Sequence, residues 1–278
     1  GGVWASLKHL PNNLIDHFFE WYGQWHGKGK DKYDCFYIKD LMPDPFNDAI
    51  ETRPSAHFWN GGIKIDEHGQ TCVPGLFAIG ETTGGVHGAN RLSGNAMTEI
   101  LVWGARAGQA AAAYVTGVNA VKTVSGGDVD VYQKVGAFVG KDNKKCGESV
   151  IEAKKRLQEI AWECIGPVRT SEGLQKAQKY AESVIKDLPE ISCVNKERVF
   201  NREWVDAVSL ENLALIMKLT AIAAEARLES RGSHYRRDYP EADPTWIKNV
   251  VLKKSSSNGV EVSKVPVNIT SLKPEVLK

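Results

Sequence analysis

The chain has 278 residues, of which 42% are hydrophobic, 25% charged and 9% aromatic, a composition typical of a folded globular protein. This length is sufficient for a substantial core and for two domains. There are 35 Lys and Arg residues against 34 Asp and Glu residues, so the net charge of +1 indicates neither a nucleic-acid partner nor an anionic membrane surface.

The first fifty residues are expected to hold a short strand and one helix. The strand covers 3–8, and the helix runs from a cap at Asn12 or Asn13 to about Trp25. A Gly- and Lys-rich loop and a proline-marked connector follow. The sequence opens without a methionine and without the layout of a signal peptide, which suggests a piece of a longer chain.

The next segment alternates short apolar runs with glycine-rich turns. Residues 61–66 alternate like a strand, 67–70 form its turn, and 75–80 are predicted to be a buried strand that ends in Gly-Glu. A glycine-rich loop covers 82–93. From about Gly94 to Val115 a helix rich in Ala, Gly and Leu is expected to pack against a sheet.

After residue 117 the pattern becomes helical. Apolar spacing predicts helices over 128–165, 170–187 and 199–231, joined by short loops, which favours an antiparallel bundle. The buried face of the third helix is predicted to comprise Val205, Val208, Leu213, Ile216, Leu219 and Ile222. The tail returns to strands over 249–254 and 260–269.

Neither a membrane span nor a metal site is predicted. The most apolar run, 97–115, contains Glu99 and Arg106 and is not expected to cross a membrane, which needs ~20 apolar residues. The cysteines include no CxxC pair, so zinc and iron–sulfur ligand sets are not expected, and their odd number suits a reducing compartment. They are Cys35, Cys72, Cys146, Cys164 and Cys193.

Two local patterns are compatible with a flavin. An apolar strand that ends in Gly80-Glu81 suits a backbone that closely approaches a sugar chain and a carboxylate that binds its hydroxyl groups. A helix that begins near Gly94 directs free N–H groups and positive partial charge at a ligand. Each pattern also fits an ordinary structure: a strand-end turn and a helix packed on a sheet.

A third group of residues suits a dicarboxylate. Such a substrate needs cationic or donor groups at both ends, and Arg binds a carboxylate through two hydrogen bonds. Arg91 lies in a Gly- and Asn-rich loop without a neighbouring acid in sequence, and His57 and His87 are flanked by small residues. A structural role for the two histidines remains equally compatible with the sequence.

These residues belong to runs that resemble one family. GLFAIGETTGGVHGANRLSGNAM (75–97) and RPSAHFWNGG (53–62) resemble the flavoprotein subunits of fumarate reductase and succinate dehydrogenase, a family that includes L-aspartate oxidase. The resemblance continues through GPVRTSEGLQKA (166–177) and through the segment 211–243 that contains ESRGSHYRRDYP. It covers essentially the whole chain.

The resemblance implies roles for individual residues. His57 and Arg91 match the catalytic positions that hold the substrate carboxylates, and His87 lies in the loop beside them. Contacts to FAD are implied for Gly80, Glu81, Gly88, Asn95, Ala96 and Met97, with Glu81 on the ribitol and the backbone of Ala96 and Met97 against the flavin. The segment Glu229–Gly232, with His234 and Arg237, is expected to organise a domain junction.

The resemblance also implies a mixed α+β fold. Its parts are the remnant of a capping domain (1–50), the C-terminal part of an α/β FAD-binding domain (51–117), an antiparallel helical domain (118–240) and a strand-rich tail (241–278). No GxGxxG motif with a ribose-binding acid is present. In the family that motif and the proton-donating arginine lie upstream, so the chain is interpreted as the C-terminal half of the enzyme.

The implied activity is interconversion of fumarate and succinate by hydride transfer with flavin N5. The implied partners are the N-terminal remainder, the dicarboxylate and an iron–sulfur subunit, with a location in the cytoplasm or on the cytoplasmic face of a membrane through partner subunits. Trp59 and Asn60 depart from the family's HxMGG-like stretch. This keeps open an L-aspartate oxidase-like or other enoate oxidoreductase, and a third possibility is a non-catalytic fragment that docks an iron–sulfur subunit.

Overall fold

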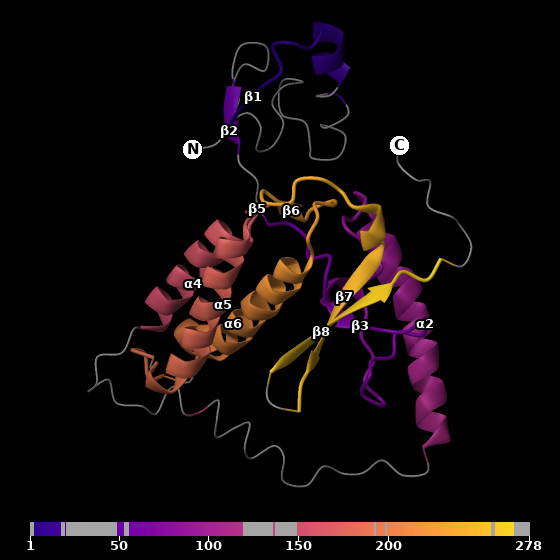
Figure 1. Cartoon of the computed structure of the whole chain (residues 1–278), viewed down its shortest axis with the longest axis vertical. Helices are drawn as coiled ribbons and strands as arrows, with labels where there is room; N and C mark the ends of the chain where they lie inside the picture. Colours follow the sequence, from indigo (N-terminus) through magenta and orange to yellow (C-terminus); the bar gives the residue numbers. More distant parts are fainter. Residues whose placement is uncertain are drawn as a thin grey trace. The chain divides into compact units, whose positions relative to one another are not determined.

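The computed structural model describes residues 3–17, 20, 49–52, 56–118, 136, 149–191, 193–197, 199–256 and 259–269 (Figure 1). The chain divides into two units, Gly1–His57 and Phe58–Lys278. Each unit is described by itself. The architecture is mixed α and β, as predicted.

The first unit contains a two-stranded sheet and a helical segment. Strand β1 (Val3–Ser6) pairs antiparallel with β2 (Ala49–Thr52), with Val3 opposite Thr52. The strand predicted at the start is therefore present, but it ends two residues early. The helix begins at Asn12, so Pro11 and not an Asn precedes it. The Pro11 carbonyl oxygen accepts hydrogen bonds from the Leu14 and Ile15 N–H groups. Residues 18–19 and 21–25 of the predicted helix lie outside the described residues.

The second unit begins with short strands and turns. Strand β3 (Ile63–Lys64) pairs in parallel with β4 (Thr83–Gly84). The buried strand predicted at 75–80 is wrong: Phe77 forms a single bridge with Gln70, and Gly80–Thr82 form a 3₁₀ helix, η1. The reason is local, because positive φ angles at Gly75 and Gly80 bend the chain out of extended conformation at both ends of this run.

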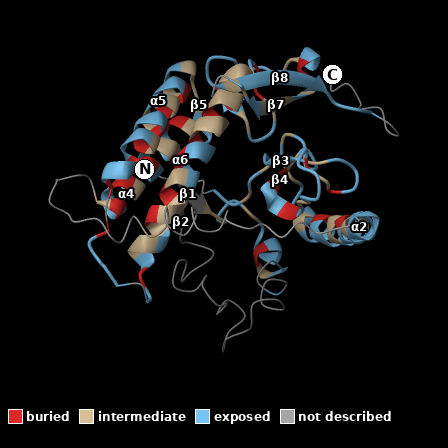
Figure 2. Cartoon of the chain, turned by 90° about the horizontal axis from the view of Figure 1, so that it is seen from below, coloured by how far each residue is buried: buried red, intermediate tan, exposed pale blue. Residues whose placement is uncertain are grey.

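Helix α2 (Asn95–Gly117) matches the predicted helix closely. It packs on the preceding turns and not on a broad sheet: Ala107 lies against Gly69, Gly104 against Ile79, and the Tyr114 ring meets the Phe77 ring edge to face. Most of its surface is exposed (Figure 2). The helix therefore presents a long apolar surface that no described part of the chain covers.

Helices α4 (Val150–Ile165), α5 (Ser171–Asp187) and α6 (Arg202–Ala226) pack side by side as a bundle (Figure 1). Each begins at a polar cap, Ser149 with Glu152 in a capping box, Thr170 and Asn201. The predicted second helix, 170–187, is confirmed: Thr170 caps it, and it ends at the short 3₁₀ helix η2 (Leu188–Glu190). The predicted segment 128–149 lies almost wholly outside the described residues.

The buried face of α6 differs from the predicted one. Val205, Leu213 and Ile216 are exposed. The core stripe alternates by three and four residues and comprises Ala207, Leu210, Ala214, Met217, Ala221 and Ala224. The four alanines on this stripe allow α4 and α5 to approach closely, whereas Val205, Leu213 and Ile216 lie outside it.

The sequence-based statement about membrane spans needs a related correction. Among the described residues α6 is the helix that is long and apolar enough to cross a membrane, by length and composition alone. The core helix of a bundle passes the same test, and α6 is packed against α4 and α5 (Figure 2). Packing in the bundle accounts for the buried part of its apolar composition, which is 33% of the apolar window.

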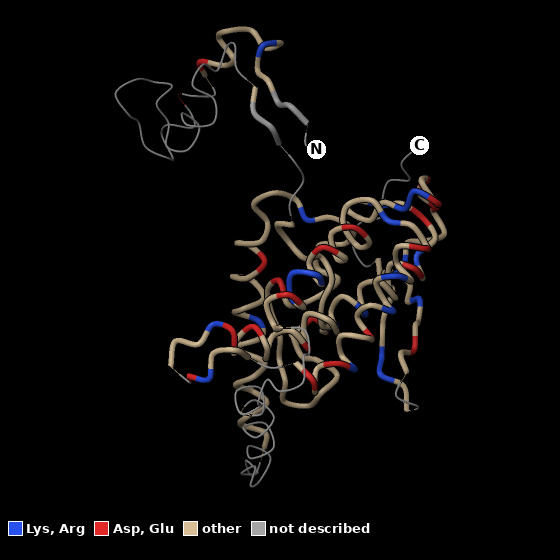
Figure 3. Tube along the Cα trace, turned by 90° about the vertical axis from the view of Figure 1, so that its left-hand side faces the viewer, with Lys and Arg blue, Asp and Glu red and all other residues tan. Residues whose placement is uncertain are grey.

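The tail contains the two predicted strands. Strand β7 (Lys248–Lys254) pairs antiparallel with β8 (Val260–Pro266) after the 3₁₀ helix η3 (Pro244–Trp246). A second parallel pair, β5 (Val168–Arg169) with β6 (Tyr235–Arg236), joins the α4–α5 connection to the segment after α6. Lys and Arg residues alternate with Asp and Glu residues along much of the described chain (Figure 3).

Candidate active site

The glycine-rich loop 82–93 leads directly into the N-terminus of α2. Gly94 takes the N-cap position with φ 84°, so no side chain caps the helix, and its first turn contains no acidic residue. Gly85, Gly88 and Gly94 all have positive φ and face open space where a side chain would project. The N-terminus of α2 thus keeps donor N–H groups and positive partial charge available to a ligand.

Phe58 joins His87 and Arg91 into one cluster. The rings of Phe58 and His87 meet edge to face with centroids 5.3 Å apart, and the Arg91 guanidinium carbon lies 4.3 Å from the Phe58 centroid. Both polar side chains therefore rest on the same aromatic ring, which restricts their orientation.

Arg91 and His87 each contain a buried nitrogen without a partner. Arg91 Nε and His87 Nε2 have no hydrogen-bond partner, and the one Arg91 hydrogen bond is a long contact of 3.5 Å to the Leu92 carbonyl oxygen. No carboxylate of the described residues forms an ion pair with Arg91. Buried polar atoms are usually satisfied, so this pair is suited to a ligand that supplies acceptors.

Glu81 and Glu99 hold the turn at the other side of the loop. Glu81 Oε1 accepts a hydrogen bond of 2.8 Å from the Trp59 N–H, and Glu99 Oε1 accepts one of 3.1 Å from the Gly80 N–H. Glu99 Oε2 is buried without a partner. Glu81 is exposed, as its predicted contact with a ribitol chain requires. It also holds the backbone of Trp59, the residue directly after Phe58.

The loop is also tied to the segment after α6. Ser233 donates two hydrogen bonds to the Ala89 carbonyl oxygen, from its N–H (3.1 Å) and from its hydroxyl (3.0 Å), and Asn60 Nδ2 donates to Ser233 Oγ (3.3 Å). Gly232 lies so close that a Cβ on it would be 2.4 Å from the Ala89 oxygen. The predicted junction role of Glu229–Gly232 thus has a structural basis at its last residue.

Glu229 holds this segment in place through a buried hydrogen-bond network. Its side chain is fully buried and accepts hydrogen bonds from Arg231 at both oxygens (2.9 Å each), from the Asp243 N–H (2.8 Å) and from Arg227. Burial raises the pKa of Glu229, but the hydrogen bonds and charges of its partners outweigh burial and hold that pKa below its usual value. The carboxylate is therefore charged and structural.

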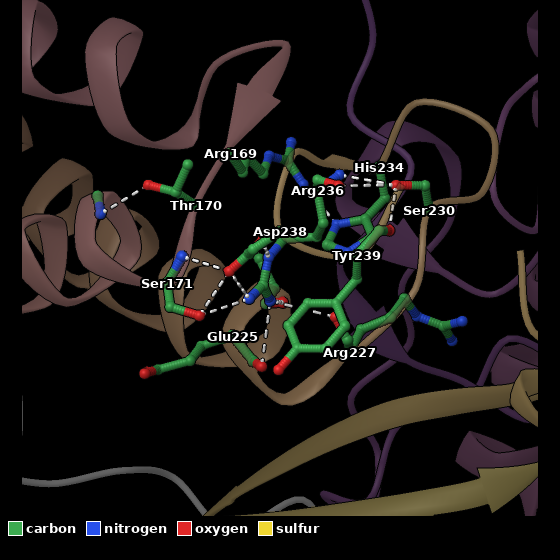
Figure 4. A network of polar contacts seen from close by, with 12 residues as sticks. Arg169, Thr170, Ser171, Glu225, Arg227, Ser230, His234, Arg236, Asp238 and Tyr239 are labelled. Atoms are coloured by element: carbon green, nitrogen blue, oxygen red, sulfur yellow. Dashed lines mark hydrogen bonds and ion pairs between the residues drawn. The ribbon is translucent and has the colours of Figure 1, made fainter. Parts of the chain in front are cut away.

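Arg236 forms a second buried network (Figure 4). Its guanidinium donates to Ser171 Oγ (2.8 Å) and to the carbonyl oxygens of Ala224 and Arg227, and it pairs with Asp238. His234 lies nearby with Nδ1 3.0 Å from Arg169 Nη1. Burial, and then the charge of Arg169, lower the pKa of His234 to about 4. These side chains join α5, α6 and β6 and are assigned a structural role.

Among the predicted site residues, the structure brings His87 and Arg91 together on the Phe58 ring. The other residues predicted here lie along the same stretch of chain up to the first turn of α2, namely Gly80, Glu81, Gly88, Asn95, Ala96 and Met97. His57 is exposed and is the last residue of the first unit, whereas Arg91 belongs to the second unit. The pairing of His57 with Arg91 thus stays a prediction.

Sequence reasoning missed Phe58, Asn60 and Ser233 as supports of the loop. Asn60 was singled out only as a departure that affects substrate fit, and Ser233 was not named, although it follows the segment Glu229–Gly232 expected at a domain junction. For Phe58 the only signal was its position beside His57. No repeating sequence pattern predicts these contacts, because they join residues separated by up to 173 positions.

Two family models match the chain. The model described as fumarate reductase flavoprotein C-term matches residues 154–278, and the model described as FAD binding domain matches residues 4–97. The uncapped N-terminus of α2 and the open glycine positions of the loop fit one end of that cofactor.

Individual relatives agree with this result. A fumarate reductase (CoM/CoB) subunit of Methanothermobacter marburgensis is 31% identical over 91% of this chain and 43% of its own. L-aspartate oxidase of Pseudomonas aeruginosa is 35% identical over 74% of this chain and 36% of its own. The Mycobacterium smegmatis Sdh1 complex in the apo form matches 100% of this chain and 45% of its own, with a TM-score of 0.80 and 29% identity.

The fold and the family models together place the chain among FAD-binding flavoproteins. More particularly, the chain belongs to the flavoprotein family of fumarate reductase and succinate dehydrogenase. It spans less than half the length of these curated relatives, 43% in the case of the Methanothermobacter marburgensis protein.

Proposed function

We propose that this chain is the C-terminal half of a flavoprotein that interconverts fumarate and succinate. The observation that carries the proposal is Arg91, a half-buried guanidinium on a ligand-facing loop, with an orphaned Nε and no acidic partner among the described residues. A substrate carboxylate would satisfy it through two hydrogen bonds. Stacking on Phe58 holds the guanidinium in place for that contact.

His87 and His57 would complete the carboxylate clamp. His87 shares the Phe58 ring with Arg91 and also has an unpartnered buried nitrogen, Nε2. His57 precedes Phe58 in the chain and is exposed, and its role as the second substrate residue rests on the family resemblance. Donors at both ends of the substrate polarise its C2–C3 unit and favour the charge that develops in the transition state.

The cofactor end of the site would comprise the turn at Gly80 and the start of α2. Glu81 is assigned to the ribitol hydroxyl groups, Gly88 to the flavin edge, and the N–H groups of the first turn to the pyrimidine end. That turn contains Asn95, Ala96 and Met97. When bound, FAD supplies the hydride donor and acceptor, N5. The positive partial charge at the N-terminus of α2 would favour negative charge on the pyrimidine end of the flavin.

The remaining parts of the enzyme are assigned by the same proposal. We retain the division into 1–50, 51–117, 118–240 and 241–278, with the dinucleotide fold and the proton donor on an N-terminal remainder. An iron–sulfur subunit would exchange electrons with the flavin, and the complex would lie in the cytoplasm or on the cytoplasmic face of a membrane. The apolar surface of α2 is suited to contact with the remainder of the flavoprotein.

A second candidate is an L-aspartate oxidase-like activity. The relative of that name is 35% identical to this chain over the matched residues, and Asn60, which departs from the family's usual stretch, lies beside the loop. Such an enzyme would act on an amino-dicarboxylate, and oxygen or a carrier other than an iron–sulfur subunit would reoxidise its flavin. The clamp at Arg91 would serve both substrates.

The test uses the complete protein as purified, and its flavin absorbance is recorded first. Fumarate reduction with a reduced dye, succinate oxidation with an oxidised dye, and L-aspartate oxidation are measured in parallel. Turnover of fumarate or succinate supports the proposal, whereas turnover of L-aspartate alone selects the second candidate. A preparation without a flavin absorbance band and without turnover would instead support a docking fragment.

A further inference from the structure

A short relay of hydrogen bonds connects three segments that are far apart in sequence. Asn60 Nδ2 donates to Ser233 Oγ (3.3 Å), and Ser233 Oγ donates to the Ala89 carbonyl oxygen (3.0 Å). The Ser233 N–H donates to the same oxygen (3.1 Å). Ala89 thereby receives two hydrogen bonds at one carbonyl group.

The direction of the relay follows from its chemistry. A carbonyl oxygen only accepts, so the single Ser233 hydroxyl proton is directed at Ala89. Ser233 Oγ must then accept from Asn60, which orients the Asn60 amide nitrogen toward Ser233 and leaves Asn60 Oδ1 buried without a partner. The Asn60 amide therefore has one orientation compatible with the relay.

The donor side of the relay is rigid. The residues Arg231 and His234 exchange two backbone hydrogen bonds (2.8 and 3.0 Å), and Arg231 is locked by both oxygens of the fully buried Glu229. Gly232 has φ +57° and packs on the Ala89 carbonyl group too closely for any side chain. Ser233 thus projects from a fixed turn onto the loop.

The accepting residue lies between the two candidate substrate residues. Ala89 is two positions after His87 and two before Arg91, in a stretch that contains Gly85 and Gly88 with positive φ and open space around them. Beyond the relay and the close approach of Gly232, the described contacts of residues 86–92 include the Phe58 ring, the long Arg91–Leu92 contact and a hydrogen bond from the Asn95 N–H to the Leu92 carbonyl oxygen (3.2 Å). A glycine-rich loop without the relay would sample more conformations.

We propose that Asn60 and Ser233 are positioning residues that hold the loop 86–92, and with it Arg91, in the conformation that binds the substrate carboxylate. The inference rests on the proposed function for its substrate. It assigns a catalytic consequence to a segment that was otherwise a structural junction. Because the relay acts on binding geometry, its loss should affect KM more than kcat.

The experiment compares Ser233→Ala, Ser233→Thr and Asn60→Ala in the complete flavoprotein with its FAD. Loss of one hydrogen bond that orders the loop is expected to raise KM for fumarate about tenfold in Ser233→Ala, with flavin content and Tm unchanged. Ser233→Thr retains the hydroxyl and should restore KM. Asn60→Ala should raise KM too, and the double variant should be no worse than Ser233→Ala, because both residues act through one relay.

Two controls separate this proposal from a structural role and from the proposed function. Ser183→Ala removes a hydroxyl that also donates to a carbonyl oxygen, that of Tyr180 (2.8 Å), within α5, and should leave KM unchanged. Amide hydrogen exchange over 86–92 should accelerate in Ser233→Ala but not in Ser183→Ala. Faster exchange in a protein that does not turn over fumarate or succinate would support the positioning of the loop and overturn the proposed function.

An active wild-type enzyme with unchanged KM in Ser233→Ala would overturn the inference. So would a joint fall of Tm, flavin content and kcat that Ser233→Thr does not reverse, because that result describes a structural residue.

Discussion

Arg236 and Asp238 form a bidentate ion pair at the junction of α5, α6 and β6, with Nε–Oδ1 and Nη2–Oδ2 distances of 2.8 Å each (Figure 4). Arg236 is fully buried, and the pair holds the pKa of Asp238 well below its usual range. The same guanidinium also satisfies the carbonyl oxygens at the end of α6. One side chain thus closes the helix and connects it to β6.

Replacement of Arg236 is expected to destabilise the fold strongly. Arg236→Met leaves the last carbonyl groups of α6 without this donor, and each buried acceptor left unpaired costs about 1–3 kcal/mol. Asp238 loses its ion pair but keeps the two hydrogen bonds from Ser171. Urea unfolding of the variant measures this loss. Arg237→Met is the matched control, because Arg237 is exposed and its described contact is a backbone hydrogen bond to Arg169. Equal stability of the two variants would contradict the assignment.

The half-buried His234 predicts a pH dependence of stability. Its pKa is lowered from its usual 6.5 to about 4 by burial and by the cations Arg169, Arg227 and Arg236. Between these two values the unfolded chain binds a proton that the folded chain does not, so stability falls as the pH decreases. Between pH 7 and pH 5 the free energy of unfolding should fall by about 2 kcal/mol from this residue.

The comparison of variants isolates that contribution. His234→Gln should remove this part of the decrease between pH 7 and pH 5, whereas His68→Gln, at an exposed turn, should retain it. Urea titrations at the two pH values give the slope. The interpretation fails if His234→Gln shows the wild-type slope.

Gly232 and Gly88 allow backbone strain to be separated from a steric clash. Both have nearly the same φ, +57° and +59°, but a Cβ on Gly232 meets the Ala89 carbonyl oxygen at 2.4 Å and a Cβ on Gly88 meets nothing within 4 Å. Gly88→Ala should cost about 1–2 kcal/mol of stability from its left-handed backbone alone. Gly232→Ala should cost about 2 kcal/mol more, because the turn and the loop must separate.

Thermal unfolding of the two alanine variants provides the measurement. A smaller loss for Gly232→Ala than for Gly88→Ala would show that the turn does not press on Ala89.

Arg91→Lys tests the substrate clamp in the complete flavoprotein. The charge remains but the two-pronged geometry is lost, so kcat/KM for fumarate should fall by about 10–100-fold with FAD content retained. Arg106→Lys, on the side of α2 near Trp103, is the control and should retain activity. Unchanged fumarate and succinate kinetics in Arg91→Lys would remove Arg91 from the site.

Glu81→Ala should show the opposite order of losses. Glu81 is assigned to the ribitol, and it also holds the Trp59 N–H, so its removal should release flavin before any effect on substrate affinity can be seen. The ratio of flavin absorbance to protein absorbance measures this. Glu67→Ala, on an exposed turn, should remain fully loaded. A fully flavinylated and active Glu81→Ala variant would show that the ribitol contact lies elsewhere.

The predictable parts of the structure are those set by near neighbours in sequence. Helices α2 and α5 begin and end close to the predicted residues, because apolar spacing and end signals, such as Pro189 directly after α5, act within one or two turns. The strand predicted at 75–80 is wrong for an equally local reason. Gly75 and Gly80 adopt positive φ angles, which the apolar pattern of this run does not reveal.

The sequence by itself determined the family and the loop that contains Arg91, because these depend on residue types in a fixed order. It did not determine which face of α6 is buried, since the helix is apolar on several sides and the bundle selects the small residues Ala207, Ala214 and Ala221. Nor did it place Asn60, Ser233 and Ala89 together. That relay exists only because the fold brings segments far apart in the chain within hydrogen-bonding distance, and no local pattern records such a contact.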